Sequence, residues 1–345
     1  MCKKSMEEKP IPHNRPTLGV EEEKAAVHVL KSGWVAQGEE VRQFEDEFCD
    51  FLGLPRGAAV AVSSGTAALY LALLALDSKG KQVAFPAYSC SALRNATALV
   101  GGIPSLVDSR TDSPNMDIGS LDTTIDVAII PHMYGLPQSI SKGKMKCHVI
   151  EDCAQSLGAF VDGVPVGLQG DIGVYSFYAT KLMTAGGQGG MIVSTDTALI
   201  TELKDYRLFD RRNDTKIRFN FQMTDLQAAI GRAQLRKFPE FLKRRAEIYH
   251  QYKLANLPLL DTVQEIQPVR FRAILQTAKQ NEIIAALKKN HITSVIPLQE
   301  WELLGGKERF VNAFNWTQST ISLPIYPSLS DEEVKRIIHV VTDHL

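Results

Sequence analysis

The sequence contains no CxxC pair, no clear excess of positive or negative charge, and no internal repeat. Its five cysteines (Cys2, Cys49, Cys90, Cys147 and Cys153) are odd in number and scattered, which is typical of reduced thiols in a cytoplasmic protein. Lysine and arginine total 38 residues against 39 acidic residues, a balance that disfavours nucleic acid or an anionic membrane as a partner. We therefore expect no disulfide framework, no metal site, no nucleic acid and no membrane.

The sequence also lacks the long apolar run that a membrane span requires. Its nineteen-residue stretch 58–76 carries no charge and approaches the length of a transmembrane helix. Small polar residues at 63–66 interrupt it, so we interpret it as a buried strand, 59–62, a turn, and an Ala/Leu-rich helix, 67–76. The polar, proline-containing first residues do not resemble a signal peptide.

Short apolar runs recur between residues 58 and 195. They are AAVAV (58–62), QVAF (82–85), PSLVD (104–108), DVAIIP (126–131), HVIED (148–152), GVYSF (173–177) and GMIVS (190–194). Several gaps, notably 66–77 and 89–101, are long enough for a helix. This alternation predicts an α/β fold with a mainly parallel sheet between helices, and the closeness of the last two runs leaves room for one antiparallel strand. Ligands bind such sheets at the carboxyl ends of the strands.

We expect three segments along the chain: an N-terminal arm (1–16), a large domain (17–240) and a small C-terminal α+β domain (241–345). The arm contains three prolines, which discourage regular structure. A helix is predicted from Thr224 to Pro239, where the proline ends it, and a second helix over about 240–253. In the small domain, RFRAIL (270–275), a helix at 280–290, STISLP (319–324) and DEEVKRIIHVV (331–341) supply strands and helices.

Three strand ends carry residues suited to chemistry, although each has an ordinary structural explanation when taken alone. The turn 63–66 offers backbone N–H groups for an anion, or is a plain helix cap. Asp152 ends a buried strand, where its carboxylate needs a cation or a ring N–H⁺ as a partner, or caps the next turn. Lys181 follows the strand at 173–177 and is either a nucleophile in a partly dry pocket or a surface lysine.

The three features together favour one class of protein. An anion cradle, a carboxylate and a lysine on the strand ends of one sheet are what an enzyme needs to hold pyridoxal 5'-phosphate (PLP). The cradle takes the phosphate, the acid takes the pyridine nitrogen, and the lysine takes the aldehyde carbon. The sequence therefore predicts a PLP enzyme.

The chain also resembles a known family, the DegT/DnrJ/EryC1/StrS aminotransferases, which are the sugar aminotransferase branch of PLP fold type I. The matching stretches are GWVAQGEEVRQFEDEF (33–48), VSSGTAALYLAL (62–73), VAFPAYSC (83–90), HMYGLP (132–137), VIEDCAQSLGA (149–159), GDIGVYSFYATK (170–181), GGM (189–191), NFQMTDLQAAIGRAQL (220–235) and SLPIYPSLSDEEV (322–334). The resemblance implies a large domain with a seven-stranded sheet and a small C-terminal domain.

The resemblance assigns cofactor roles to several residues. Lys181 would be the catalytic residue, which binds PLP as a Schiff base and later moves a proton. Asp152 would pair with the pyridine nitrogen and Gln155 with the ring oxygen. The phosphate would be held by residues that come from the cradle, the strand before Lys181 and, in a homodimer with shared sites, the neighbouring subunit. These phosphate ligands are Gly65, Thr66, Ser176 and, from the neighbouring subunit, Asn220.

The substrate would meet Tyr88, His132 and Tyr134, according to the same resemblance. Departures from the family's pattern spare Lys181, Asp152 and the phosphate cradle, but they include one expected cofactor-binding residue, Cys90. Cys90 replaces the aromatic residue that covers the ring, and Gln222 replaces an arginine. The family's glutamate is missing from GGQGG (186–190), Ala36 replaces a threonine, and the usual His-containing stretch near the C-terminus is absent.

The resemblance implies transfer of an amino group, from glutamate, to the ketone of a sugar that is most plausibly nucleotide-linked, in two half-reactions. Such a reaction belongs to amino sugar and polysaccharide biosynthesis. Two alternative functions stay open, and a third is disfavoured by one residue. A non-nucleotide cyclic ketone is one, and a PLP-binding sensor or assembly protein without turnover is another. The third, a PLP-dependent sugar dehydratase, is disfavoured because such relatives carry histidine where this chain has Lys181.

Overall fold

The computed structural model describes residues 9–262 and 266–345. Its α-helices are α1 (Val20–Ser32), α2 (Glu39–Leu52), α3 (Gly65–Ala75), α4 (Ala92–Val100), α5 (Thr197–Arg207), α6 (Asp225–Leu254), α7 (Gln280–Lys289), α8 (Val311–Ser319) and α9 (Asp331–Thr342). Its strands are β1 (Ala59–Val62), β2 (Gln82–Pro86), β3 (Ile103–Val107), β4 (Val127–Pro131), β5 (His148–Asp152), β6 (Phe160–Val161), β7 (Val164–Pro165), β8 (Ile172–Ser176), β9 (Gly190–Val193), β10 (Ile266–Gln267), β11 (Ala273–Gln276) and β12 (Thr320–Leu323).

The central sheet has seven strands in the order β1-β9-β8-β5-β4-β2-β3. The pairs β8/β5, β5/β4, β4/β2 and β2/β3 are parallel, whereas β9 runs antiparallel to both β8 and β1. The α/β prediction is therefore confirmed, and each of the seven apolar runs supplies one strand. The uncharged stretch 58–76 forms β1 and the whole of α3, as expected. Among the described residues, no helix is both long enough and apolar enough to cross a bilayer.

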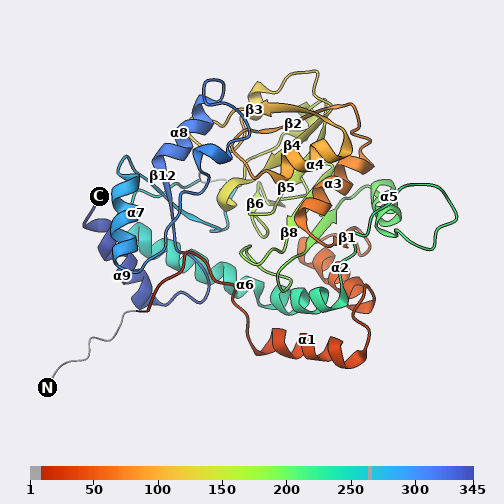
Figure 1. The fold of residues 1–345 in the computed structure, drawn as a ribbon, viewed down its shortest axis with the longest axis horizontal. Coiled ribbons are helices and arrows are strands. Elements are labelled where there is room, and N and C mark those ends of the chain that lie inside the picture. Colours follow the sequence, from red (N-terminus) through yellow and green to blue (C-terminus); the bar gives the residue numbers. More distant parts are fainter. Residues whose placement is uncertain (1–8, 263–265) are drawn as a thin grey trace.

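Each face of the sheet has its own apolar core, because successive strand residues point to opposite faces. On one face, Ala59 and Ala61 pack with Phe44 and Phe48 of α2 and Phe238 of α6. The other face is covered by α3, α4 and α5, which pack on Val60 and Val62, among other residues. Figure 1 shows the strands lying between these helices. The layered arrangement leaves the carboxyl ends of the parallel strands as the edge at which loops gather.

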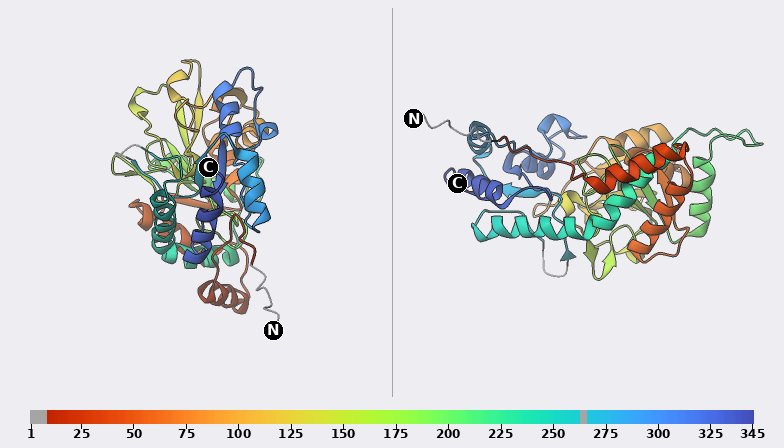
Figure 2. Two further views of the ribbon diagram at one scale, coloured as in Figure 1. Left: turned by 90° about the vertical axis from the view of Figure 1, so that its left-hand side faces the viewer. Right: turned by 90° about the horizontal axis from the view of Figure 1, so that it is seen from below.

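The structure corrects one helix boundary. Pro239 was predicted to end a helix, yet α6 runs without a break from Asp225 to Leu254 with Pro239 inside it. Proline removes only one backbone hydrogen bond, and packing on both sides offsets that loss. Phe238 lies in the core beside α2, and Tyr252 lies in the core around β11 and β12. The helix thus spans both parts of the molecule (Figures 1 and 2), and the domain boundary we place at 240 falls within it.

The C-terminal part is built on the antiparallel pair β11/β12, which α7 and α9 cover. The described part of the N-terminal arm, residues 9–16, is not loose. Ile11 forms a bridge with Ile292 and is fully buried, and the His13 Nε2 lies 2.8 Å from the Ser322 hydroxyl. Local prolines prevent regular structure here, but a buried isoleucine still fastens the arm. Residues 1–8 of the expected arm lie outside the described residues.

Candidate active site

Two neighbouring strands bring the predicted acid and lysine together. Asp152 is the last residue of β5, which pairs in parallel with β8 so that Asp152 lies opposite Val174. Strand β8 ends at Ser176, and a turn after it carries Lys181. Asp152 and Lys181 are both partly exposed, yet burial is the largest influence on the pKa of each. Because each charge also affects the pKa of the other group, the two side chains lie close together; we call the partly exposed region around them, at the carboxyl edge of the sheet, the recess.

The electrostatics of this pair are those of a lysine held near a carboxylate. Burial raises the pKa of Asp152, while the N–H of Ala154, which donates to its carboxylate at 3.0 Å, and the charge of Lys181 oppose that change. Burial likewise lowers the pKa of Lys181, and the charge of Asp152 partly restores it. A desolvated lysine loses its proton more readily, which makes it a better nucleophile.

The start of α3 forms the expected anion cradle. Ser64 caps the helix and accepts a hydrogen bond from the Ala67 N–H, so the N–H groups of Gly65 and Thr66 are left at the positive end of the helix. Gly65 also lies against the end of β8: a Cβ at this position would stand 2.8 Å from the Ser176 Cβ. The close approach requires glycine and brings the Ser176 hydroxyl to the cradle.

Gln155 follows Asp152 by three residues and is oriented by the turn at 132–135. Its side-chain oxygen accepts a hydrogen bond from the Tyr134 N–H at 2.8 Å. The amide nitrogen of Gln155 is therefore the end that remains to donate, as a bond to the ring oxygen of a bound cofactor would require. Tyr134 itself has a φ of 61°, an uncommon left-handed conformation for a non-glycine residue, which is typical of functional turns.

The three residues predicted to meet the substrate are buried, whereas Asp152 and Lys181 are partly exposed. These three residues are Tyr88, His132 and Tyr134. The hydroxyls of Tyr88 and Tyr134 lie 2.5 Å apart, and their rings meet edge to face. His132 is fully buried, and its Nε2 lies 3.0 Å from the Glu151 carboxylate. A substrate contact by these residues stays a prediction.

Glu151, which sequence reasoning passed over, anchors the end of β5. Its carboxylate accepts hydrogen bonds from the N–H groups of Gly167, Gln169 and Gly170 at 2.6–2.8 Å, besides its contact with His132. Ligand atoms of His132, Glu151 and Cys153 lie within 4.8 Å of one another, close enough for a metal ion. The carboxylate is already saturated with donors, and burial raises the pKa of the Cys153 thiol, so the cluster is better suited to holding β5 in place.

Two predicted cofactor residues lie on the surface of the single chain. Cys90 is exposed, yet its thiol is close enough to Lys181 for its charge to affect the lysine pKa. Asn220 is also exposed and accepts a hydrogen bond from the Gln222 N–H. The neighbouring Phe221 accepts a bond from the N–H of Ser63 at 2.8 Å, so this segment lies beside the cradle turn.

The structure adds a wall to the recess that the sequence did not reveal. The residues before β11 pack on the turn at 132–135, where the Arg272 N–H donates to the Tyr134 carbonyl. The Lys181 Nζ lies 5.5 Å from the centre of the Phe271 ring. The run RFRAIL carries two arginines, Arg270 and Arg272, among apolar residues, and this is the one signal that could have drawn attention to the segment.

Lys181, Asp152, the amide of Gln155 and the cradle at Gly65 and Ser176 fit one prosthetic group, with donors for a phosphate at one end and a carboxylate for a protonated ring nitrogen at the other. Fold and site together define a pyridoxal phosphate-dependent enzyme.

Comparison with known proteins refines this class. The model of the DegT/DnrJ/EryC1/StrS aminotransferase family matches residues 16–342 of this chain. The chain is 29% identical to GDP-perosamine synthase of Vibrio cholerae, over 97% of this chain and 99% of that one. It is 30% identical to dTDP-4-dehydro-2,3,6-trideoxy-D-glucose 4-aminotransferase of Saccharopolyspora spinosa, over 94% of each. Its fold is similar to that of S. venezuelae DesV, solved with a ketimine intermediate, with a TM-score of 0.87 and 25% identity over 94% of each chain.

The chain belongs to the DegT/DnrJ/EryC1/StrS aminotransferase family, as its resemblance implied. It is a pyridoxal phosphate-dependent aminotransferase.

Proposed function

We propose that this aminotransferase moves an amino group from glutamate to the ketone of a nucleotide-linked sugar, in two half-reactions that share one site. The observation that carries the proposal is the meeting of Asp152 and Lys181 in one recess beside the cradle of α3. The names of the Vibrio cholerae and Saccharopolyspora spinosa relatives support a sugar attached to a nucleotide as the acceptor.

Each residue of the recess has a part in this reaction. Bound PLP supplies an electron-withdrawing ring that stabilises negative charge on the carbon whose proton is removed. Lys181, with a pKa lowered by burial, attaches the cofactor through Nζ and carries the proton between substrate and cofactor. Asp152 keeps a proton on the ring nitrogen, and Gln155 donates from its amide nitrogen.

Chemical labelling tests the central assignment. The purified protein should be yellow, and borohydride should fix the cofactor to the peptide that contains Lys181. Peptide mapping by mass spectrometry reads the result. A label on any other lysine would contradict the assignment.

The two half-reactions are tested separately. Glutamate should convert the absorption of the lysine-bound cofactor to that of the aminated cofactor, and a keto sugar should reverse the change. A panel of keto sugars, each offered free and nucleotide-linked, identifies the acceptor. No spectral change with any amino donor would instead indicate a PLP-binding protein without turnover.

We also propose that two copies of the chain form the working enzyme in the cytoplasm. The segment 208–221 supports this because it projects from the body of the molecule in Figure 1 and in the right-hand view of Figure 2. It also carries exposed apolar side chains. Ile217 is 80% exposed and Phe219 is 57% exposed. Exposed apolar side chains of this size commonly mark protein interfaces.

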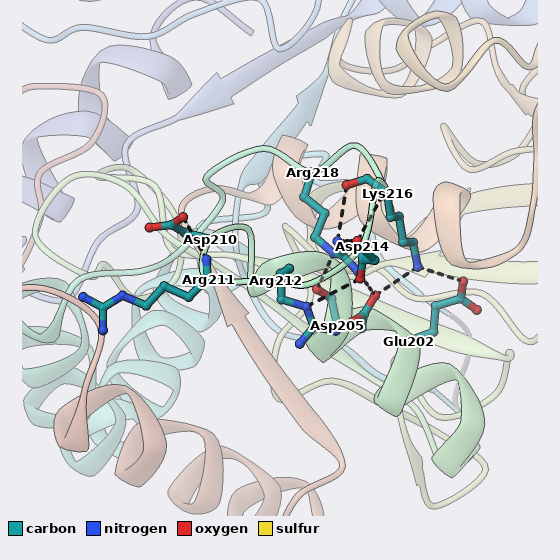
Figure 3. Close-up of polar contacts among 8 residues, drawn as sticks. All are labelled: Glu202, Asp205, Asp210, Arg211, Arg212, Asp214, Lys216 and Arg218. Carbon is teal, nitrogen blue, oxygen red and sulfur yellow. Dashed lines mark hydrogen bonds and ion pairs between the residues drawn. The ribbon is translucent and has the colours of Figure 1, made fainter.

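An ion-pair network fixes the shape of this segment (Figure 3). The Arg218 guanidinium, only 3% exposed, pairs with Asp205 at 2.8 Å and with Asp214 at 2.7 Å. Lys216 and Arg212 also pair with Asp205. Because Asp205 belongs to α5, the network ties the segment to the body, and a preshaped segment loses less entropy on docking than a flexible one. In the proposed dimer, Asn220 at the end of the segment would reach the cofactor of the neighbouring subunit.

Mixed dimers test the shared site. Lys181→Ala and Asn220→Trp each remove one component, the second by blocking the contact with bulk. If the two residues serve different sites, a mixed dimer collects both lesions in one site and leaves the other intact. Random exchange would then restore about a quarter of all sites. Co-expressed chains that form mixed dimers without recovered activity would refute the shared site.

A further inference from the structure

Arg272 is a cation in the segment before β11, beside the same Phe271 ring that Lys181 approaches. The Arg272 Cζ and the Lys181 Nζ each lie 5.5 Å from the centre of the same Phe271 ring, so at most twice that distance separates them. The charge of Arg272 also acts on the lysine: burial first, and the charge of Arg272 in addition, lower the pKa of Lys181. The guanidinium is therefore within reach of any small substrate that reacts at the lysine.

The charge of Arg272 has no close counter-ion. Among the described residues, no carboxylate lies within ion-pair distance of its guanidinium, and its hydrogen-bond contact is Nη1 to the Nε2 of His13 at 3.3 Å. Burial, with the charges of Arg272 and Arg245, lowers the pKa of His13 to about 3, so this partner is neutral. Glu302 influences Arg272 from a distance, but its carboxylate caps the turn at Gln299.

A second buried arginine shows what a structural role looks like in this protein. The Arg245 Nη1 donates to three backbone carbonyls, those of Arg270, Phe271 and Ile325. Arg245 is 1% exposed, whereas Arg272 keeps partial access to solvent. Arg245 therefore holds three backbone segments together, while most of the Arg272 donors make no hydrogen bond to the described residues.

We propose that Arg272 binds a carboxylate of the amino donor and so favours amino acids over simple amines as donors. A guanidinium pairs with a carboxylate through two parallel hydrogen bonds, and a partly desolvated arginine gains most from such a partner. The proposal rests on the proposed aminotransferase function, because the donor's amino group must react at Lys181 while its carboxylate reaches Arg272.

Equilibrium binding of glutarate to the PLP-loaded enzyme tests the contact without turnover. Glutarate has two carboxylates and no amino group, so it cannot react, and calorimetry measures its affinity. Arg272→Gln should weaken glutarate binding by on the order of tenfold to a hundredfold while the protein keeps its cofactor. Arg270→Gln is the matched control, because Arg270 lies two residues away and pairs with Asp261 at 2.8 Å; it should leave glutarate affinity unchanged.

Half-reactions with three donors identify the carboxylate. Glutamate has two, alanine has only the one beside its amino group, and isopropylamine has none. In Arg272→Gln, a raised KM for both glutamate and alanine would assign the contact to the α-carboxylate. A raised KM for glutamate alone would assign it to the side-chain carboxylate, and the rate with isopropylamine should not fall in either case.

Two results would overturn the proposal. One is wild-type glutarate affinity in Arg272→Gln, and the other is loss of PLP from that variant, which would mean that the guanidinium serves the cofactor. If Arg272→Gln does not fold, Arg272→Lys decides, because a point charge should bind glutarate several-fold more weakly than a guanidinium. The function itself fails separately: in that case wild-type enzyme would show no half-reaction with any donor.

Discussion

The two walls of the recess differ in how their charges are balanced. The wall formed by the ends of β5 and β8 carries Asp152 and Lys181, two groups of opposite sign that moderate each other's pKa. The wall before β11 carries Arg272 with a neutral histidine beside it. The two charges of the first wall nearly balance each other, which suits a cofactor that stays in place. The second lacks an anion, which suits a substrate that arrives and leaves.

The largest effect is expected on the first wall, at Lys181. Lys181→Ala should reduce turnover to background, because both the attachment of the cofactor and the carrier of the proton are lost. Steady-state assays with glutamate and an accepted keto sugar measure it. Lys204→Ala is a suitable control, since Lys204 donates to the Gly57 carbonyl on the exposed surface and should leave turnover intact. Substantial turnover in Lys181→Ala would mean that Lys181 neither attaches the cofactor nor carries the proton, and the proposed difference between the two walls would not hold.

Asp152→Asn should lower kcat by about a hundredfold or more and keep part of the PLP affinity. An amide does not hold a proton on the ring nitrogen, so the ring withdraws electrons less strongly, while the phosphate cradle remains. The rate of the glutamate half-reaction and the PLP content should be measured together. Asp162→Asn, at an exposed turn with a φ of 50° that asparagine tolerates, controls for the loss of a carboxylate. Near-normal rates in Asp152→Asn would make the acid structural.

Behind the first wall, Glu151→Gln should lower the free energy of unfolding by about 2–3 kcal/mol, because an amide cannot accept from all the donors that the carboxylate satisfies. The donors concerned are the N–H groups of Gly167, Gln169 and Gly170. Urea unfolding measures the change. Wild-type stability would mean that water replaces the lost contacts and that Glu151 does not hold β5.

The contrast between the walls also explains what could be predicted from sequence. Asp152 and Lys181 were found because both follow buried strands, and adjacent parallel strands end at the same edge of a sheet. Arg272 and His13 could not be found in this way, because they lie 259 positions apart in the sequence and meet only when the N-terminal arm packs on the C-terminal part. Glu151 was overlooked because it points away from Asp152 on the opposite face of β5.

Most of the fold followed from local pattern for the same reason. Seven apolar runs became seven strands because each is short and bounded by turn residues, and all but β3, which begins exposed, are mostly buried. The prediction at Pro239 was wrong, because proline usually ends a helix. Phe238 and Tyr252 pack into two different cores, and these contacts keep α6 continuous. The two-residue strands β6, β7 and β10 were missed because so short a segment has no readable alternation.

On the second wall, His13 should make the protein sensitive to acid. Burial and the charges of Arg272 and Arg245 lower the pKa of His13 in the folded protein from its ordinary value of 6.5 to about 3, so the unfolded chain binds a proton first as pH falls. Stability is therefore full above about pH 6.5 and is lost progressively towards pH 3. His13→Gln should remove about 1–2 kcal/mol of the loss between pH 7.5 and 5, measured by urea unfolding. His339→Gln, with a side chain 77% exposed, should leave the loss unchanged. An equal loss in His13→Gln and wild type would show that His13 titrates freely.

The smallest effect is expected at Cys90, where the two walls meet the surface. The thiol is exposed and close enough to Lys181 to influence its pKa, so a larger side chain has room to extend over a bound ring. Cys90→Phe should keep PLP bound and strengthen binding by about 0.5–1.5 kcal/mol, the usual contribution of a stacked aromatic pair. Cys90→Ala is the matched control, because it removes the thiol without adding a ring. Fluorescence titration of the apoenzyme with PLP measures both variants. Loss of cofactor in Cys90→Phe, with Cys90→Ala unchanged, would mean that another side chain already covers the ring and that the site departs from the expected layout.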